Sequence, residues 1–234
     1  MTEAGRFWAV IPAAGTGTRM QTELPKQYLS INGRRVIEYS LETFCLHPQI
    51  AGLVVALAAG DKVWEGLSLA KHPKIRTAPG GKERCHSVLN CLHMLSTMTG
   101  AEDWVLVHDA ARPCINREDI DQLIITLREH PVGGLLALPV RDTMKRADIG
   151  QDHGQHVCET VNRQGLWHAL TPQMFRLGKL SQALEQAIRQ GELVTDESQA
   201  MELAGLRPRL VEGRAENIKI TRPSDLKLAK LFLS

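Results

Sequence analysis

Short apolar runs alternate with stretches of helical periodicity along most of the chain. The apolar runs are too short and too rich in β-branched residues for buried helices, so each of them predicts a buried strand. Strands that alternate with helical segments are typical of α/β proteins rather than of all-helical or all-strand ones. Strands are expected at residues 7–12, 53–57, 74–78, 104–107, 135–140 and 209–212.

Helical stripes separate these strands. In residues 88–95, and again in residues 120–127, apolar side chains recur at positions i, i+3, i+4 and i+7, which form one face of a helix. Asn116 precedes the second stripe and is expected to cap that helix, because its side chain can accept a hydrogen bond from a free backbone N–H group. Further helices are expected at residues 36–46, 177–190 and 198–204, and from about residue 224.

This alternation predicts the fold class α/β, with a mostly parallel, twisted, Rossmann-like sheet and helices on both of its faces. Functional residues are then expected in the loops that follow the strands, where the ligand crevice of such sheets lies. The pattern breaks at residues 141–162, which are polar, contain Gly150 and Gly154, and have no helical stripe. The sequence therefore predicts a single domain over residues 1–234, with an extended arm at about 141–162.

Composition narrows the class of protein further. The 234 residues are 43% hydrophobic and 23% charged, with a net charge of +2, so neither a disordered chain nor an overall basic field for nucleic acid or membrane surfaces is expected. Five widely spaced cysteines argue against a disulfide framework. The N-terminus lacks a signal-peptide pattern, and no apolar stretch is long enough to cross a bilayer. A cytoplasmic protein with no nucleic-acid or membrane partner is expected.

The loop after the first strand has the composition of a phosphate-binding loop. Residues 12–20 are mostly small, so that their backbone N–H groups can approach a phosphate closely. Met20 occupies the position where a dinucleotide-binding fingerprint needs a third glycine, and the spacing of a Walker loop is absent. Two cations, Arg19 and Lys26, follow instead. Because they come after a loop of small residues behind the first strand, we interpret them as triphosphate-binding groups rather than as solvated surface residues.

Several motifs in a fixed order resemble one family. After AVIPAAGTGTRM and PKQYL come GGKER, VHDAARP and PVRDTMK, and then TPQ, TDE and EGR with NIKIT, so the match covers essentially the whole chain. This pattern resembles the 2-C-methyl-D-erythritol 4-phosphate cytidylyltransferases of non-mevalonate isoprenoid synthesis. The resemblance implies the transfer of a cytidylyl group from CTP to 2-C-methyl-D-erythritol 4-phosphate, which gives 4-diphosphocytidyl-2-C-methyl-D-erythritol and pyrophosphate.

The chemistry of that reaction fits the residues that the resemblance designates. The attacking group is already an anionic phosphate, so no Ser–His pair or covalent nucleophile is needed. In-line alignment and countercharge at the CTP α-phosphate are needed instead, and Arg, Lys and Mg²⁺ supply them. By the resemblance Arg19 and Lys26 are catalytic, and Mg²⁺ is the cofactor that accompanies CTP.

The resemblance also implies two groups of binding residues. Asp109 has two interpretations from sequence: it holds or orients Mg²⁺, or it caps a helix. Arg112 likewise is either a ligand of the substrate phosphate or a structural partner. Lys82 and Asn162 depart from the family, which often has acidic residues there. The CTP-binding residues are Ala13, Ala14, Gly15, Gly17, Gly80, Gly81, Arg84 and Ser87. The substrate-binding residues are Asp109, Arg112, Thr143, Arg163, Thr171, Thr195 and Lys219, with Asp109 also as the metal ligand.

Oligomeric state and alternative functions complete the prediction. The polar arm cannot build its own core, so it is expected to cross to a second copy in a homodimer, where Thr143 and Arg163 complete the partner's pocket. Thr195 could instead cap the helix at residues 198–204. A pyrophosphorylase for another polyol phosphate such as ribitol 5-phosphate, a dinucleotide-dependent oxidoreductase and a non-catalytic nucleotide sensor remain as alternative functions.

Overall fold

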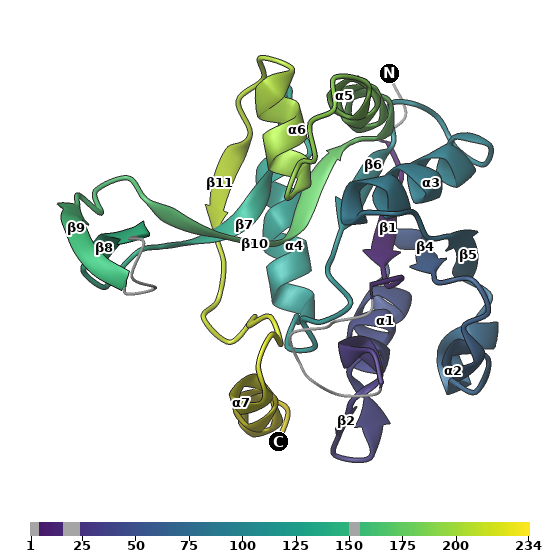
Figure 1. The fold of residues 1–234 in the computed structure, drawn as a ribbon. Coiled ribbons are helices and arrows are strands. Elements are labelled where there is room, and N and C mark those ends of the chain that lie inside the picture. The colour runs from purple at the N-terminus through teal and green to yellow at the C-terminus, as the bar shows by residue number, and fades with distance from the viewer. Residues whose placement is uncertain (1–4, 16–23, 150–154) are drawn as a thin grey trace.

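A computed structural model describes residues 5–15, 24–149 and 155–234. Its centre is a seven-stranded sheet in the order β11-β7-β10-β6-β1-β4-β5 (Figure 1). The pairs β1–β4, β1–β6, β4–β5 and β7–β11 are parallel, so the expected mostly parallel sheet is confirmed. The strands are β1 (Phe7–Pro12), β4 (Ile50–Leu57), β5 (Ile75–Pro79), β6 (Trp104–Val107), β7 (Gly133–Pro139), β10 (Trp167–Arg176) and β11 (Arg209–Glu212).

One central strand, β10, was not expected from the sequence. β10 runs antiparallel between β6 and β7, and its register shifts between Ala169 and Gln173. Pro172 lies inside this shift, and a proline cannot donate a hydrogen bond to a neighbouring strand. Because the segment also alternates poorly between apolar and polar residues, its sequence does not resemble that of a central strand.

Helices cover both faces of the sheet, as expected. The side chains of β1 alternate, so that Ala9 and Ile11 join the core beneath α1 and α4, whereas Trp8 and Val10 join the core beneath α3, α5 and α6. The larger helices are α1 (Val36–Leu46), α3 (Arg84–Ser96), α4 (Arg117–Leu127), α5 (Leu177–Arg189), α6 (Glu197–Leu203) and α7 (Pro223–Phe232). The short ones are α2 (Lys62–Glu65) and the 3₁₀ turns η2 (Lys26–Tyr28) and η3 (Ser68–Lys71).

Two N-terminal caps test the sequence analysis. The Asn116 side chain accepts a hydrogen bond of 2.9 Å from the Asp119 N–H, so the predicted cap of α4 is confirmed. The cap of α6 is Asp196, which accepts from the Gln199 N–H at 2.9 Å. The capping interpretation of Thr195 was therefore wrong by one residue, because the carboxylate next to it takes that position.

The expected arm is a β-hairpin that projects from the ends of β7 and β10 (Figure 1). Its strands, β8 (Met144–Ile149) and β9 (Gln155–Val161), pair with each other and with no other strand of the described residues. A second small hairpin, β2 (Ser30–Ile31) with β3 (Arg34–Arg35), turns through Asn32 and Gly33 at positive φ angles of 50° and 79°.

Two further expectations concern covalent and membrane structure. All five cysteines lie in the described part of the chain and are unpaired, four of them buried and Cys158 exposed, as expected for a chain without a disulfide framework. Within the described residues, no helix has the length and apolar character that spanning a bilayer requires.

Candidate active site

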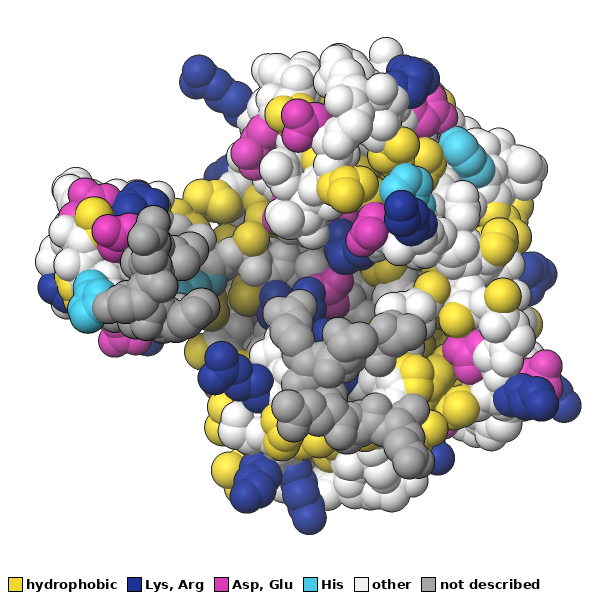
Figure 2. All heavy atoms as spheres, in the orientation of Figure 1, with side chains coloured by type: hydrophobic (Ala, Val, Ile, Leu, Met, Phe, Trp, Pro, Cys, Tyr) yellow, Lys and Arg dark blue, Asp and Glu magenta, His cyan; other side chains and the backbone are white. Residues whose placement is uncertain are grey.

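A pocket of about 440 Å³ opens at the carboxyl ends of β1, β5 and β6. The loops that follow these three strands form it, together with η2 and the segment that precedes α7. Charged side chains of both signs gather in the hollow at the centre of the face shown in Figure 2. The lining includes nine predicted site residues, namely Ala13, Ala14, Gly15, Lys26, Gly81, Arg84, Ser87, Asp109 and Lys219.

The loop after β1 is held by a residue that the sequence analysis did not select. Gln27, which is 4% exposed, donates through Nε2 to the carbonyl oxygens of Ala13 at 2.6 Å and Gly15 at 3.1 Å. These bonds fix the loop beside η2, and Lys26 on η2 lines the pocket. Arg19 and Gly17, which were predicted here, lie outside the described residues.

The loop after β5 is closed by the predicted residue Ser87. Its hydroxyl accepts from the Gly81 N–H at 3.0 Å and donates to the Glu83 carbonyl oxygen at 3.2 Å. Gly80 lies deeper, where its N–H donates to the Leu57 carbonyl at 2.7 Å. Lys82 is exposed and lines the pocket, so it places a positive charge at the pocket wall.

Asp109 lies where three cations converge, two residues beyond the end of β6. Its Oδ1 is 3.0 Å from Arg84 Nε, and its Oδ2 is 2.8 Å from Lys219 Nζ and 3.7 Å from Arg112 Nε. Burial would raise the pKa of Asp109, but the attraction of Arg84, Lys219 and Arg112 outweighs burial and holds that pKa well below its usual range. Asp109 is therefore ionised, and its carboxylate organises the cations rather than capping a helix.

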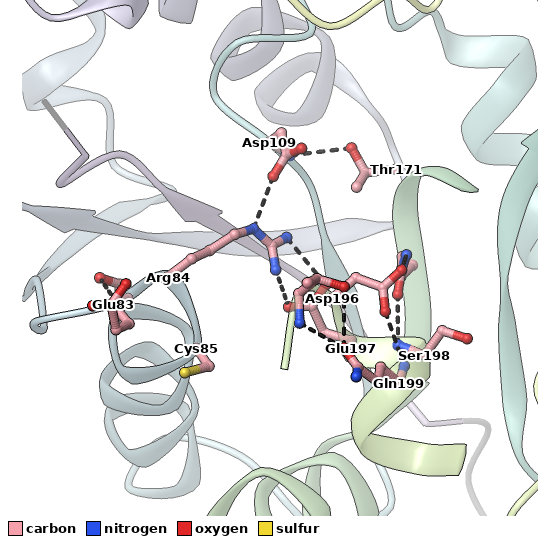
Figure 3. A network of polar contacts seen from close by, with 12 residues as sticks. Glu83, Arg84, Cys85, Asp109, Thr171, Asp196, Glu197, Ser198 and Gln199 are labelled. Atoms are coloured by element: carbon pink, nitrogen blue, oxygen red, sulfur yellow. Dashed lines mark hydrogen bonds and ion pairs between the residues drawn. The ribbon is translucent and has the colours of Figure 1, made fainter. Parts of the chain in front are cut away.

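Arg84 connects this cluster to α6 (Figure 3). Its Nη1 and Nη2 donate to Glu197 Oε1 at 2.7 Å and Oε2 at 3.1 Å, a bidentate pair. Burial opposes the charge on Arg84, but Glu197 and Asp109 outweigh burial and raise its pKa. The guanidinium is thus shared between two carboxylates on different elements of the fold.

His108 joins the loop after β6 to β10. Its Nε2 is 3.1 Å from the Arg112 carbonyl oxygen, so Nε2 carries the proton, and Nδ1 accepts from the Thr171 hydroxyl at 3.0 Å. The Thr171 oxygen in turn accepts from the Asp109 N–H at 3.1 Å. Burial lowers the pKa of His108 to about 4, so the ring is neutral near pH 7.

A smaller pocket of about 140 Å³ continues from the first one. Arg84, Asp109 and Lys219 line both pockets and form the wall between them. Arg112, Thr171 and Thr195 line only the smaller pocket, and the Arg112 side chain is held by the Asn217 carbonyl oxygen at 2.7 Å. The structure thus brings five of the seven predicted substrate-binding residues together.

The other two, Thr143 and Arg163, lie apart from both pockets of their own chain. They are exposed at the base of the arm, where Arg163 Nη1 donates to the Arg141 carbonyl oxygen. Beside them, the Asn162 side chain accepts from the Gln164 N–H at 3.0 Å, so it holds a local turn. Thr143 and Arg163 therefore line neither of the two pockets of their own chain.

The sequence analysis did not select three polar residues that organise the site. Gln27, His108 and Glu197 are 4%, 0% and 0% exposed. Each of the three occurs within a motif quoted above. A large polar side chain inside a matching motif was therefore the feature of the sequence that could have indicated them. Their partners come from distant parts of the chain, which spacing alone does not reveal.

A divalent metal ion at this site would need oxygen donors from carboxylates or from substrate phosphates. Among the described residues, no group of three or more His, Cys, Asp and Glu side chains is arranged to hold a metal ion. Mg²⁺ commonly takes one or two carboxylates together with substrate phosphates and water. Asp109, ionised and at the wall of the pocket, fits a metal ion that takes most of its ligands from a triphosphate.

Comparisons with known proteins agree with this geometry. The family described as IspD, 2-C-methyl-D-erythritol 4-phosphate cytidylyltransferase, matches residues 7–234. An enzyme of that name from Pseudomonas fluorescens is 54% identical over 96% of this chain and 94% of its own, and one from Vibrio parahaemolyticus is 52% identical over 97% and 94%. The solved structure of the Francisella tularensis enzyme is similar with a TM-score of 0.84, at 34% identity, over 97% of this chain and 100% of its own.

An α/β sheet with a cation-lined pocket at the carboxyl ends of its strands is here the fold and site of a nucleotidyltransferase. The chain belongs to the family of 2-C-methyl-D-erythritol 4-phosphate cytidylyltransferases. It is an enzyme of non-mevalonate isoprenoid synthesis that makes 4-diphosphocytidyl-2-C-methyl-D-erythritol from CTP and 2-C-methyl-D-erythritol 4-phosphate. This family membership replaces the three alternative functions, namely a pyrophosphorylase for another polyol phosphate, a dinucleotide-dependent oxidoreductase and a non-catalytic nucleotide sensor.

Proposed function

We propose that the two pockets hold the two substrates and that the reaction is a single in-line displacement between them. The larger pocket takes CTP, with its phosphates against the loop after β1 and its base against the loop at Gly80 and Gly81. The smaller pocket takes the polyol phosphate, between Arg112, Thr171 and Thr195. The observation that carries the proposal is the shared wall of Arg84, Asp109 and Lys219, which lies between the two volumes.

Arg19 and Lys26 are the proposed catalytic residues. Negative charge builds up around the α-phosphorus as the substrate phosphate attacks and pyrophosphate leaves, and fixed cations stabilise that charge without reorganising. Lys26 lines the larger pocket from η2, seven residues after Arg19 in the sequence. The attacking phosphate is itself the nucleophile, so the chain needs no general base.

Mg²⁺ is the proposed cofactor and is bound as a complex with CTP. The residue proposed to hold or orient it is Asp109, the ionised carboxylate at the pocket wall. When bound, the ion neutralises triphosphate charge. Arg84 and Lys219 keep the Asp109 carboxylate directed along the wall, at 3.0 Å and 2.8 Å.

A homodimer in the cytoplasm is the proposed state of the enzyme. Thr143 and Arg163 lie outside both pockets of their own chain, and the β8–β9 hairpin projects away from the sheet (Figure 1). A two-fold dimer in which each hairpin reaches the other subunit would bring these two residues to the partner's smaller pocket, with self-complementary contacts.

The stereochemistry at phosphorus tests the proposed displacement. CTP with sulfur in place of one non-bridging oxygen on the α-phosphate has a chiral α-phosphorus that appears in the product. A single in-line attack inverts its configuration, and ³¹P NMR distinguishes the two product diastereomers. Retention of configuration would instead indicate a covalent nucleotidyl-enzyme intermediate and would contradict the proposal.

A further inference from the structure

Glu197 is a fully buried carboxylate beside the active site. It is the first residue of α6, its side chain is 1% exposed, and it lines neither pocket. Both of its oxygens accept hydrogen bonds from Arg84. Burying a pair of opposite charges costs desolvation energy that their attraction does not reliably recover, so such a pair is weak evidence of a stabilising role. Its position next to the pocket wall suggests a role in the reaction.

The geometry of Arg84 transmits the position of Glu197 to the pocket. A guanidinium is planar and rigid, so two hydrogen bonds at Nη1 and Nη2 also fix the direction of Nε. That nitrogen donates to Asp109 Oδ1 at 3.0 Å (Figure 3). Because Lys219 contacts the other oxygen of Asp109 at 2.8 Å, three of the wall's charged groups take their positions from the Glu197 carboxylate.

The charges of the cluster also indicate that Glu197 holds Arg84 in place. Three cations, Arg84, Arg112 and Lys219, face only two carboxylates, Asp109 and Glu197, so the cluster keeps one positive charge. Burial raises the pKa of Glu197, and the guanidinium of Arg84 opposes that rise. Without the Glu197 charge, three cations would compete for one carboxylate, and Arg84 would be free to turn toward substrate phosphates.

We infer that Glu197 is a positioning residue for cytidylyl transfer: through Arg84 it holds Asp109 and Lys219 in the wall between the two substrates. The inference rests on the proposed reaction at this site. Glu197 touches neither substrate, so its removal changes the rate of the chemical step rather than the first binding of CTP.

The experiment compares Glu197→Gln with Glu202→Gln, a charge-matched change at an exposed position of the same helix. We expect Glu197→Gln to lower kcat about tenfold or more with a KM for CTP within threefold, because small displacements of reacting groups are costly. Glu202→Gln should stay within twofold of the wild type. Arg84→Met combined with Glu197→Gln should be no slower than Arg84→Met alone, since the effect of Glu197 passes through Arg84.

Thermal unfolding separates positioning from support of the fold. If Glu197→Gln is less stable but keeps kcat within twofold at a temperature where it is folded, the positioning role is wrong. If that variant does not fold, Glu197→Asp retains the charge with a shorter side chain, and we expect at least a threefold loss of kcat; an unchanged kcat overturns the inference. A wild-type chain without cytidylyl transfer would contradict the proposed reaction itself, and the positioning role with it.

Discussion

Gly80 lies directly against Ala14, and this contact joins two of the loops at the larger pocket, the one after β1 and the one after β5. A Cβ atom added to Gly80 would lie 2.2 Å from the Ala14 Cβ and 3.0 Å from the Leu57 carbonyl oxygen. Neither neighbour can move away easily, because Ala14 follows β1 and Leu57 ends β4. The absence of a side chain at residue 80 therefore sets the spacing between the loop after β1 and the loop after β5.

Gly80→Ala should disturb both stability and nucleotide binding. The added methyl group must push the two loops apart, which costs roughly 1–3 kcal/mol of unfolding free energy. Chemical denaturation measures that loss, and calorimetric titration should show weaker CTP binding. Gly100→Ala is the control, because nothing lies within 4 Å of its added Cβ. Equal unfolding free energies for the two variants would contradict the packing role of Gly80.

Arg19→Ala and Lys26→Ala should each lower kcat by roughly two or more orders of magnitude. Preorganised charge at a transition state is worth about 3–4 kcal/mol per group in comparable sites. Lys26 is only half-buried, and both residues are selected for their charge rather than for packing, so melting temperatures should barely move. Steady-state kinetics with both substrates at saturation measure the effect. A variant that keeps near-normal turnover, or that unfolds, would remove that residue from the catalytic machinery.

Stability should fall as the pH is lowered from about 6.5 to about 4, in part because of His108. Burial lowers the folded-state pKa of His108 from 6.5 to about 4, so in this range the unfolded chain binds a proton that the folded chain does not. Complete protonation would cost about 3 kcal/mol. His108→Gln should flatten the dependence of unfolding free energy on pH in this window. His47, whose pKa burial also lowers, should retain part of the slope.

An unchanged slope in His108→Gln would show that this ring takes up its proton equally in the folded and unfolded chain.

The Asp109 carboxylate affects stability in a lower range of pH. Its folded-state pKa is depressed, so the stability that it contributes is present above its unfolded value and is lost only as the pH falls below 3.8. Denaturation curves measured at half-unit intervals of pH separate the two contributions.

Mixed dimers should recover activity if the arms serve the partner's site. Arg19→Ala and Arg163→Ala chains, each inactive alone, are co-expressed with different affinity tags and purified as the mixed dimer. If Arg163 acts in the partner's pocket, one pocket carries both lesions and the other none, so about half of the wild-type activity returns. If Arg163 acts in its own chain's pocket, each pocket has one lesion, and the mixture stays inactive.

The sequence predicted the elements of the fold where local patterns determine them. The strand at residues 7–12, the stripes of α3 and α4 and the cap at Asn116 all have periodicity or side-chain chemistry that acts over a few residues. β10 was missed because it is defined by its two neighbouring strands rather than by its own pattern. Proline and polar residues within it disguise a central strand.

The residues of the site likewise fall into those that sequence motifs predict and those whose role depends on contacts between distant parts of the chain. Motif resemblance selected Asp109, Arg84 and Lys219, and the structure brings them together. What the sequence could not reveal is that the Asp109 carboxylate lies against both of these cations and against Arg112 as well, because Arg84 and Lys219 are separated by 135 positions in the chain. Glu197 and Gln27 likewise act through partners that only the folded chain brings near.

Product formation with different nucleotides tests the central claim most directly. The purified enzyme is incubated with 2-C-methyl-D-erythritol 4-phosphate, Mg²⁺ and CTP, UTP, ATP or GTP, and both pyrophosphate and the nucleotidyl-linked polyol are quantified. The account predicts equal amounts of pyrophosphate and 4-diphosphocytidyl-2-C-methyl-D-erythritol with CTP, and far slower product formation with the other three nucleotides. Equal rates with CTP and UTP would contradict the cytidylyl specificity, and no product with CTP would contradict the assigned reaction.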